Sequence, residues 1–250
     1  MHDFIERPSR DIVELLAPAR ILRAGINLSN FLLVTGRTPG GDPVGVSPDM
    51  ARALATLLDA DVRYVCYESP GLVADAAEKD EWDVALIGAE PQRAAVIAFA
   101  PAYTEIEASY LVPRNSAIRD IAEIDRPGVR IAVTDRTAYG LWLDRNIASA
   151  ELVRTKTLDE AAQVFAAQGL EALAGLRPRL ISDVDAIPNT RILEGRFMAV
   201  QQAVGTPIRK AEAVGFLRKF VRGAIESGFV AGLIEKHAVD GLTVAASGSS

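Results

Sequence analysis

Short apolar runs alternate with amphipathic segments along most of the chain. Apolar runs bounded by polar, glycine or proline residues predict strands, and apolar residues repeating every three or four positions predict helices. The predicted strands are 21–26, 62–67, 84–88, 109–113, 129–134, 152–156, 180–182 and 198–204. The predicted helices are 9–17, 47–58, 72–81, 139–146, 158–175 with a break at Gly169, 211–226 and 230–237. Strands alternating with helices are typical of an α/β fold with mostly parallel sheets.

Polar residues follow two of the predicted strands. The segment 27–30 reads Asn-Leu-Ser-Asn, and the segment 88–93 runs from a glycine to an arginine. Ligands of open α/β sheets usually bind at the carboxyl ends of the strands. The pattern therefore indicates a binding site near these two segments. Ser9 and Ser47 are in position to cap the helices that follow them.

Composition excludes several classes of function. The chain has 250 residues, enough for one or two domains, and a net charge of -6 that argues against nucleic-acid binding. Cys66 is its single cysteine, and His2 and His237 are its histidines. These residues offer no metal-ligand set, and we expect a buried, inert thiol at Cys66. No glycine-rich nucleotide loop or nucleophile elbow occurs, so we expect no cofactor.

Targeting signals are also lacking in the sequence as it stands. No apolar stretch approaches the length of a membrane span, and the first residues do not follow the pattern of a signal peptide. The expectation is a cytoplasmic protein, or a periplasmic one if a signal segment has been removed. The tail 247–250 is expected to be flexible.

Five segments in order carry a resemblance to a known family. They are ILRAGINLSNF, PVGVSPDMARALATLLDADVRYV, WDVALIGAEPQRAAVIAFAPAY, GVRIAVTDRTAYGLWL and ESGFVAGLIEKHAV. Their order and spacing resemble the family 3 extracellular solute-binding proteins, the polar amino-acid receptors of bacterial ABC importers. The resemblance covers about residues 20–238, nearly the whole chain.

The resemblance implies a two-lobed, periplasmic-binding-protein-like type II α/β fold with two crossover strands. Lobe 1 would comprise 20–108 plus 198–250, lobe 2 would comprise 109–197, and 1–19 would form an N-terminal helical extension. A small amino-acid-like ligand would lie in the interlobe cleft and be captured by hinge closure. The implied partners are this ligand and an ABC permease, with the protein itself a monomer.

Two charged residues align with the family's ligand contacts. Arg93 corresponds to the arginine that grips the ligand carboxylate, a pairing that suits a planar guanidinium. Asp183 corresponds to the carboxylate that receives the ligand amine, although the local match is imperfect because Pro178 replaces the pattern's earlier aspartate. The alternatives are a solvated helix arginine and a turn aspartate at a strand end.

Four further positions belong to the expected site. Thr137 falls in the loop that meets the carboxylate at a helix start, or else it serves as an N-cap. Gly88 and Glu90 lie in a loop where relatives use hydroxyl residues, so Glu90 either faces the ligand or satisfies a helix dipole. Asn30 stands where relatives stack an aromatic ring. With Asp183, Glu90 would favour a cationic or amine-bearing ligand.

Three classes of function remain open at this point. The first is a binding protein without enzymatic activity, serving a transporter or a sensor. The second is an enzyme on the same scaffold, because cyclohexadienyl dehydratases resemble this family; turnover of prephenate or arogenate would reveal it. The third is the effector domain of a regulator, which the absence of a helix-turn-helix segment and the acidic pI disfavour.

Overall fold

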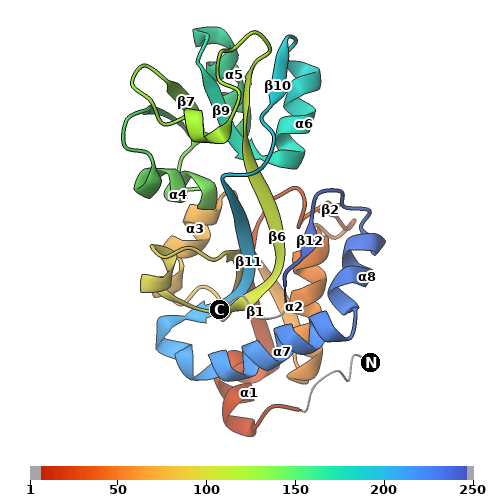
Figure 1. The fold of residues 1–250 in the computed structure, drawn as a ribbon. Coiled ribbons are helices and arrows are strands. Elements are labelled where there is room, and N and C mark those ends of the chain that lie inside the picture. Colours follow the sequence, from red (N-terminus) through yellow and green to blue (C-terminus); the bar gives the residue numbers. More distant parts are fainter. Residues whose placement is uncertain (1–6, 247–250) are drawn as a thin grey trace. The chain divides into compact units, whose positions relative to one another are not determined.

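The computed structural model describes residues 7–246, so His2 and the tail 247–250 lie outside it. Contacts divide the chain into two compact units, which we describe separately. Unit 1 comprises Met1–Glu105 and Gln201–Ser250, and unit 2 comprises Ile106–Val200. Unit 1 is therefore built from both ends of the chain (Figure 1).

Unit 1 has a mixed sheet in the order β4-β1-β5-β11-β6, with the short β12 beside β6. Strand β1 is parallel to both β4 and β5, whereas β11 is antiparallel to β5. The strands are β1 (Ile21–Asn27), β4 (Asp61–Tyr67), β5 (Val84–Gly88), β6 (Ile97–Pro113), β11 (Met198–Pro207), β12 (Thr243–Val244) and the separate pair β2 (Gly36–Arg37) and β3 (Pro43–Val44). The long strands β6 and β11 continue into unit 2.

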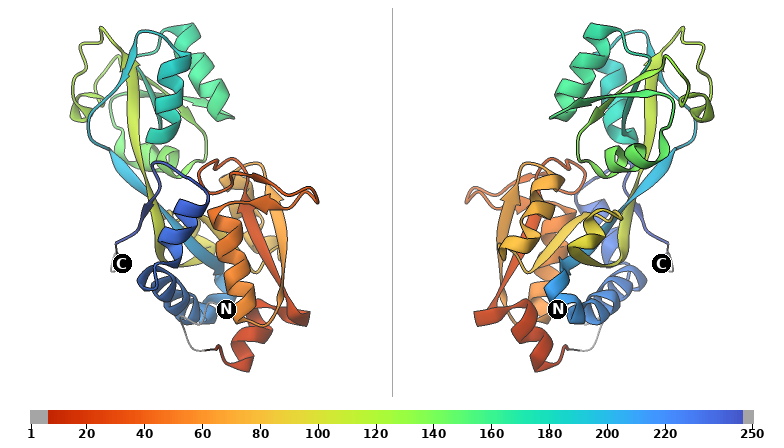
Figure 2. Two further views of the ribbon diagram at one scale, coloured as in Figure 1. Left: turned by 90° about the vertical axis from the view of Figure 1, so that its right-hand side faces the viewer. Right: turned by 90° about the vertical axis from the view of Figure 1, so that its left-hand side faces the viewer.

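Helices cover the sheet of unit 1. They are α1 (Arg10–Leu16), α2 (Val46–Leu57), α3 (Pro70–Asp75), α7 (Val214–Glu226) and α8 (Phe229–Lys236), with short 3₁₀ turns η1 (Pro18–Arg20), η2 (Ala77–Lys79), η3 (Arg93–Ala95) and η5 (Ile208–Ala213). Helix α8 packs against both α2 and α7 (Figure 2). On the α3 side, Ala85 and Ile87 of β5 pack with the fully buried Trp82, whose indole N–H donates to the Val73 carbonyl at 3.0 Å. This indole bond ties α3 to the start of β5.

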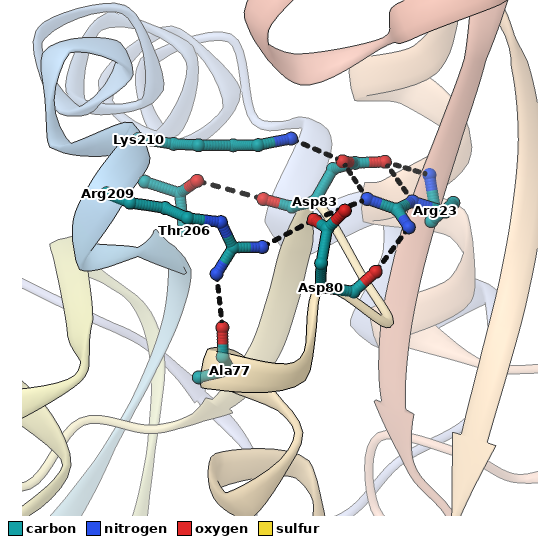
Figure 3. Close-up of polar contacts among 7 residues, drawn as sticks. All are labelled: Arg23, Ala77, Asp80, Asp83, Thr206, Arg209 and Lys210. Carbon is teal, nitrogen blue, oxygen red and sulfur yellow. Dashed lines mark hydrogen bonds and ion pairs between the residues drawn. The ribbon is translucent and has the colours of Figure 1, made fainter.

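An ion-pair network centred on the buried Asp83 lies at the same end of β5 (Figure 3). Asp83, which is 0% exposed, immediately precedes β5 and accepts three bonds from Arg23 of β1. The Arg23 backbone N–H and Nε donate to Oδ2 at 3.0 and 2.9 Å, and Nη2 donates to Oδ1 at 2.8 Å. Lys210 adds an ion pair to Asp83, while Arg209 and Arg23 both reach Asp80. Hydrogen bonding to Asp83 raises the pKa of Arg23 above its usual value, so the guanidinium stays charged.

Unit 2 has a sheet in the order β6-β9-β7-β8, with β10 beside β6. Strand β7 is parallel to both β8 and β9, and β9 is antiparallel to β6. The elements are η4 (Ile121–Glu123), β7 (Arg130–Thr134), α4 (Ala138–Asn146), β8 (Glu151–Thr155), α5 (Leu158–Gln168), β9 (Ala172–Leu176), α6 (Arg177–Ala186) and β10 (Thr190–Ile192).

Two apolar layers hold this sheet, one on each face. Ile131 and Val133 of β7 pack in one cluster with α4, and Ala132 packs in the other with Phe165 of α5 and Leu180 of α6. Successive side chains of a strand point to opposite faces, so the alternation explains why β7 is buried on both sides.

Unit 2 repeats the arginine–carboxylate contact of unit 1. Glu171 immediately precedes β9 and accepts from the backbone N–H and Nε of Arg130 through Oε2, both at 2.9 Å. Nη2 of Arg130 completes the pair at 2.9 Å to Oε1. We call this arrangement, seen in Arg23–Asp83 and Arg130–Glu171, the strand clasp. It fixes the register between β1 and β5 in unit 1 and between β7 and β9 in unit 2.

The structure corrects four local predictions. The helix 158–175 ends at Gln168, because Gly169 adopts the left-handed conformation with φ 57°, and strand β9 follows. The segment 180–182 lies inside α6 and is not a strand. Ser47 lies within α2 and bonds the Tyr103 hydroxyl at 3.2 Å, while Gly45 occupies the N-cap position. Cys66 is exposed on β4, not buried. By contrast, Ser9 caps α1 as predicted.

The two clasps provide a matched pair of substitutions. Asp83 is fully buried, whereas the side chains of Arg130 and Glu171 are 37% and 34% exposed. Breaking a buried pair costs about 3–5 kcal/mol, whereas an exposed pair contributes about 1 kcal/mol or less. We therefore expect Arg23→Ala to lower the free energy of unfolding, measured with urea, well below that of Arg130→Ala. Equal losses of unfolding free energy in the two variants would show that the buried clasp does not stabilise the fold more than the exposed one.

Candidate functional site

The carboxyl end of β5 carries the charged part of unit 1's candidate site. Gly88 ends the strand, and its carbonyl accepts a hydrogen bond from Nη1 of Arg93 at 2.6 Å. Arg93 and Glu90 are both only 4% exposed. The backbone of this loop is held by the Ala89 N–H, which donates to the Gln201 carbonyl at 2.7 Å. The loop thus carries an arginine and a carboxylate, both largely desolvated, as expected of a charge-recognition site.

The loop after β1 carries Asn30, which is 8% exposed. Its side-chain Oδ1 accepts from the Leu32 N–H at 3.3 Å, and its carbonyl accepts from the N–H groups of Leu33 and Val34. The side chain therefore stabilises its own turn, as asparagine often does. This local role explains the residue without a ligand, although its amide Nδ2 is also available as a donor.

Three aromatic residues near the sequence-predicted site have different surroundings. Tyr103 is fully buried and bonds Ser47, so it belongs to the core. The Tyr67 hydroxyl donates to Glu81 at 2.7 Å. Phe31 is 39% exposed and directly follows Asn30. Among these three, Phe31 is the ring that remains accessible for stacking.

In unit 2, Thr137 is the N-cap of α4. Its hydroxyl accepts from the Gly140 N–H at 3.1 Å and donates to the Thr134 carbonyl at the end of β7 at 2.8 Å. A Cβ at Gly140 would lie 2.9 Å from that carbonyl oxygen and from the Thr137 hydroxyl, so the tight loop requires glycine. The capping interpretation of Thr137 is confirmed.

Asp183 lies on α6 and is 5% exposed. Its Oδ1 accepts from Nε of Arg179, one helical turn earlier, at 2.9 Å. Within residues 7–246, its Oδ2 accepts no hydrogen bond. Burial raises the pKa of Asp183, and Arg179 opposes this rise. The residue is therefore a helix aspartate with a cation partner, rather than the strand-end aspartate that the sequence suggested.

Tyr139 connects the two unit 2 candidates. It is 3% exposed, and its hydroxyl makes no hydrogen bond of normal geometry within residues 7–246. Burial raises the pKa of this hydroxyl, the nearby hydroxyls of Thr134 and Thr137 lower it, and the charges of Arg179 and Asp183 act on it in opposite directions. Thr137 and Asp183 thus share the surroundings of one buried hydroxyl.

Sequence reasoning missed Arg179. It pairs with Asp183 at i, i+4 spacing on a helix face, a signal that is legible only once 177–186 is assigned to a helix. Its Nη2 also donates to Asp159, in the first turn of α5, at 2.7 Å. Among residues 7–246, no group of three or more His, Cys, Asp and Glu side chains could hold a metal ion.

A family model places these loops in a known group of proteins. Residues 28–239 match the model of the bacterial extracellular solute-binding proteins, family 3. The chain belongs to this family. The match spans both units and confirms the resemblance seen in the sequence, together with the periplasmic-binding-protein-like α/β fold. No curated protein matches the chain.

Solved structures with the same fold cover three kinds of protein. An amino acid ABC transporter substrate-binding protein from Streptococcus pneumoniae, bound to L-arginine, has a TM-score of 0.72 at 20% identity, covering 94% of this chain and 99% of its own. The ancestral amino acid-binding protein AncCDT-1, a precursor of cyclohexadienyl dehydratase, has 0.71 at 18%, covering 90% and 98%. A histidine kinase sensor domain with similarity to periplasmic binding proteins has 0.74 at 17%, again covering 90% and 98%.

These identities are low enough that the matches establish the fold alone. The family itself is named for extracellular proteins, and its members bind solutes. In the described part of this family 3 chain, no helix has both the length and the apolar character needed to cross a membrane.

The Thr137 cap can be tested apart from any ligand. Replacing an N-cap threonine by alanine costs about 0.5–2 kcal/mol, whereas serine caps about as well. We expect Thr137→Ala to lower the free energy of unfolding by about 1 kcal/mol in urea denaturation, and Thr137→Ser to leave it nearly unchanged. If the alanine variant is as stable as the wild type, the capping contacts do not stabilise α4.

Proposed function

We propose that this solute-binding protein captures a small amino-acid-like ligand outside the cytoplasm and delivers it, as a monomer, to an ABC permease. The proposed ligand contacts are Asn30, Gly88, Glu90 and Arg93 from unit 1 and Thr137 and Asp183 from unit 2. The observation that carries the proposal is Arg93: it is buried at the end of β5, in the arginine-containing segment of a chain whose family is established.

Arg93 is suited to receive the ligand carboxylate. Its guanidinium is held by the Gly88 carbonyl, so a ligand meets a preoriented group. Charge-assisted hydrogen bonds in a desolvated place are stronger than neutral ones. The start of α4 at Thr137 supplies backbone N–H groups and the positive end of a helix dipole, which also favour a carboxylate.

Asp183 is suited to receive the ligand amine. Arg179 occupies Oδ1, and Oδ2 remains as an acceptor. In unit 1, Glu90 provides a second carboxylate and Asn30 an amide donor for the remaining polar atoms of the ligand. Phe31, which is partly exposed beside Asn30, takes the place of the missing stacking ring.

We propose binding without catalysis. General acid–base catalysis needs a carboxyl group whose proton transfer is matched to the reaction, and Asp183 is tied to a permanently charged arginine. AncCDT-1, a precursor of cyclohexadienyl dehydratase with the same fold, shows which reaction to test. If the proposal holds, incubation of the protein with prephenate or arogenate leaves both compounds unconsumed. Consumption of either by the purified protein would replace binding by catalysis.

Arg93→Ala tests the carboxylate contact. A hydrogen bond to a charged group contributes about 1.5–3 kcal/mol, so affinity should fall at least about tenfold. A thermal-shift screen of amino acids identifies the ligand, because a ligand that binds the folded state raises its stability. Calorimetry then compares the wild type with Arg93→Ala, Arg93→Lys and Arg218→Ala, a control at an exposed arginine of α7.

The expected order of affinity is wild type and Arg218→Ala, then Arg93→Lys, then Arg93→Ala, because lysine keeps the charge but not the bidentate geometry. Circular dichroism shows whether each variant is folded. A folded Arg93→Ala protein with wild-type affinity would remove Arg93 from the site.

A further inference from the structure

Two buried asparagines of unit 1, Asn27 and Asn30, have side chains whose orientation is fixed by hydrogen bonds. Oδ1 of Asn27, the last residue of β1, accepts from the backbone N–H of Ser29 at 3.2 Å and from its hydroxyl at 2.8 Å. Oδ1 of Asn30 accepts from the Leu32 N–H at 3.3 Å. A backbone N–H can only donate, so the side-chain atom that faces it is the oxygen in both residues. The position of each amide nitrogen Nδ2 is thereby fixed as well.

Both amide nitrogens are donors that the described chain does not use. Within residues 7–246, neither Nδ2 donates a hydrogen bond. Each asparagine keeps 8% of its surface exposed, and neither Nδ2 is among the fully enclosed polar atoms. Each nitrogen is therefore reachable from outside, on a side chain that is otherwise packed into unit 1. A donor whose rotamer is already fixed loses little conformational entropy when it binds a ligand.

The loop that carries these donors has no charged side chain. Residues 27–34 read NLSNFLLV, so the polar side chains are the two asparagines and Ser29. The hydroxyl proton of Ser29 is already donated to Asn27, and the carbonyl of Asn30 accepts from two backbone N–H groups further along the loop. The buried side chains of the loop thus offer donors, next to the partly exposed ring of Phe31.

The loop lies at the same edge of the unit 1 sheet as the Arg93 loop. Strands β1 and β5 are parallel neighbours, with Ile26 paired to Leu86, so their carboxyl ends meet at one edge. Ligands of open α/β sheets usually bind at such an edge. Within unit 1 alone, this edge therefore combines a buried arginine with two neutral amide donors.

We propose that Asn27 and Asn30 form a recognition subsite for an oxygen atom of the ligand side chain, so that the protein favours amino acids with a side-chain carboxamide or carboxylate. The inference rests on the proposed function and goes beyond it by adding Asn27 and naming the side-chain chemistry. An amide N–H donates to a carbonyl or carboxylate oxygen. A lysine ammonium would instead face N–H groups, and a leucine side chain would cover the donors without offering an acceptor, and both arrangements are costly.

Calorimetry with six amino acids, after a thermal-shift screen of all twenty proteinogenic ones, tests this preference in the wild type. L-asparagine and L-aspartate are compared with L-leucine, which has the same branched shape without the oxygen. L-glutamine and L-glutamate are compared with L-lysine, a long side chain that only donates. We expect the best oxygen-bearing ligand to bind at least about tenfold more tightly than L-leucine and L-lysine. Comparison of each amide with its acid shows whether the oxygen comes from a carboxamide or a carboxylate.

Asn27→Asp separates the donor from the turn. Aspartate still offers an oxygen to the N–H and hydroxyl of Ser29, but it replaces Nδ2 with an acceptor. The affinity ratio of the best oxygen-bearing ligand to L-lysine should fall at least about tenfold, and Asn30→Asp should act in the same way. Asn115→Asp, at an exposed position of unit 2, adds the same charge and should leave the ratio unchanged.

A folded Asn27→Asp protein with the wild-type ratio would overturn the inference, since an asparagine that serves the turn alone keeps its contacts in this variant. Binding of L-leucine or L-lysine by the wild type as tightly as the best oxygen-bearing ligand would also overturn it, while the proposed function stands. Binding of none of the twenty amino acids would overturn both. If circular dichroism shows that Asn27→Asp is unfolded, the ratio in Asn30→Asp decides in its place.

Discussion

In each unit, an arginine binds a carboxylate that lies just before a neighbouring strand, and this contact fixes how the two strands pair. In unit 1, Arg23 of β1 binds Asp83 through both its backbone and its guanidinium; in unit 2, Arg130 of β7 binds Glu171 in the same way. Removing either partner from a buried clasp leaves an uncompensated charge, so the contact strongly favours a single register. Because the clasp lies where the third strand begins, it sets which residue stands at the carboxyl end of that strand, where the candidate site lies.

The correspondence between the units extends beyond the clasp. The residue after β1, Leu28, donates its N–H to the last carbonyl of β4 at 2.9 Å, and the residue after β7, Asp135, does the same with β8 at 2.8 Å. With the registers aligned in this way, Leu176 at the end of β9 occupies the position of Gly88 at the end of β5. After this position unit 1 has a loop that carries Glu90 and Arg93, whereas in unit 2 helix α6 begins at once with Arg177. The charged pair of unit 2 comes instead from α6, the helix that follows.

This difference also explains what the sequence could and could not predict. Strand β5 was predicted with its observed bounds, because its apolar run is delimited by Asp83 and by the polar loop after Gly88. Thr137 was recognisable as a cap from its place before an amphipathic segment. Strand β9 was missed because alanine and leucine favour helices and a strand buried on both faces shows no alternation. With that strand missing, 180–182 was predicted as a strand, and the Arg179–Asp183 pair, which depends on helical spacing, could not be recognised.

In the proposed function, the carboxylate of a zwitterionic ligand binds Arg93 and its amine binds Asp183, whose Oδ1 is already held by Arg179. A crystal structure of the complex with the amino acid that gives the largest thermal shift tests this most directly. The account predicts ligand carboxylate oxygens within about 3 Å of the Arg93 guanidinium and the ligand amine within about 3 Å of Asp183 Oδ2, with Arg179 still on Oδ1. A ligand bound elsewhere, with Arg93 still bonded to Gly88 and Asp183 contacting Arg179 alone, would contradict it.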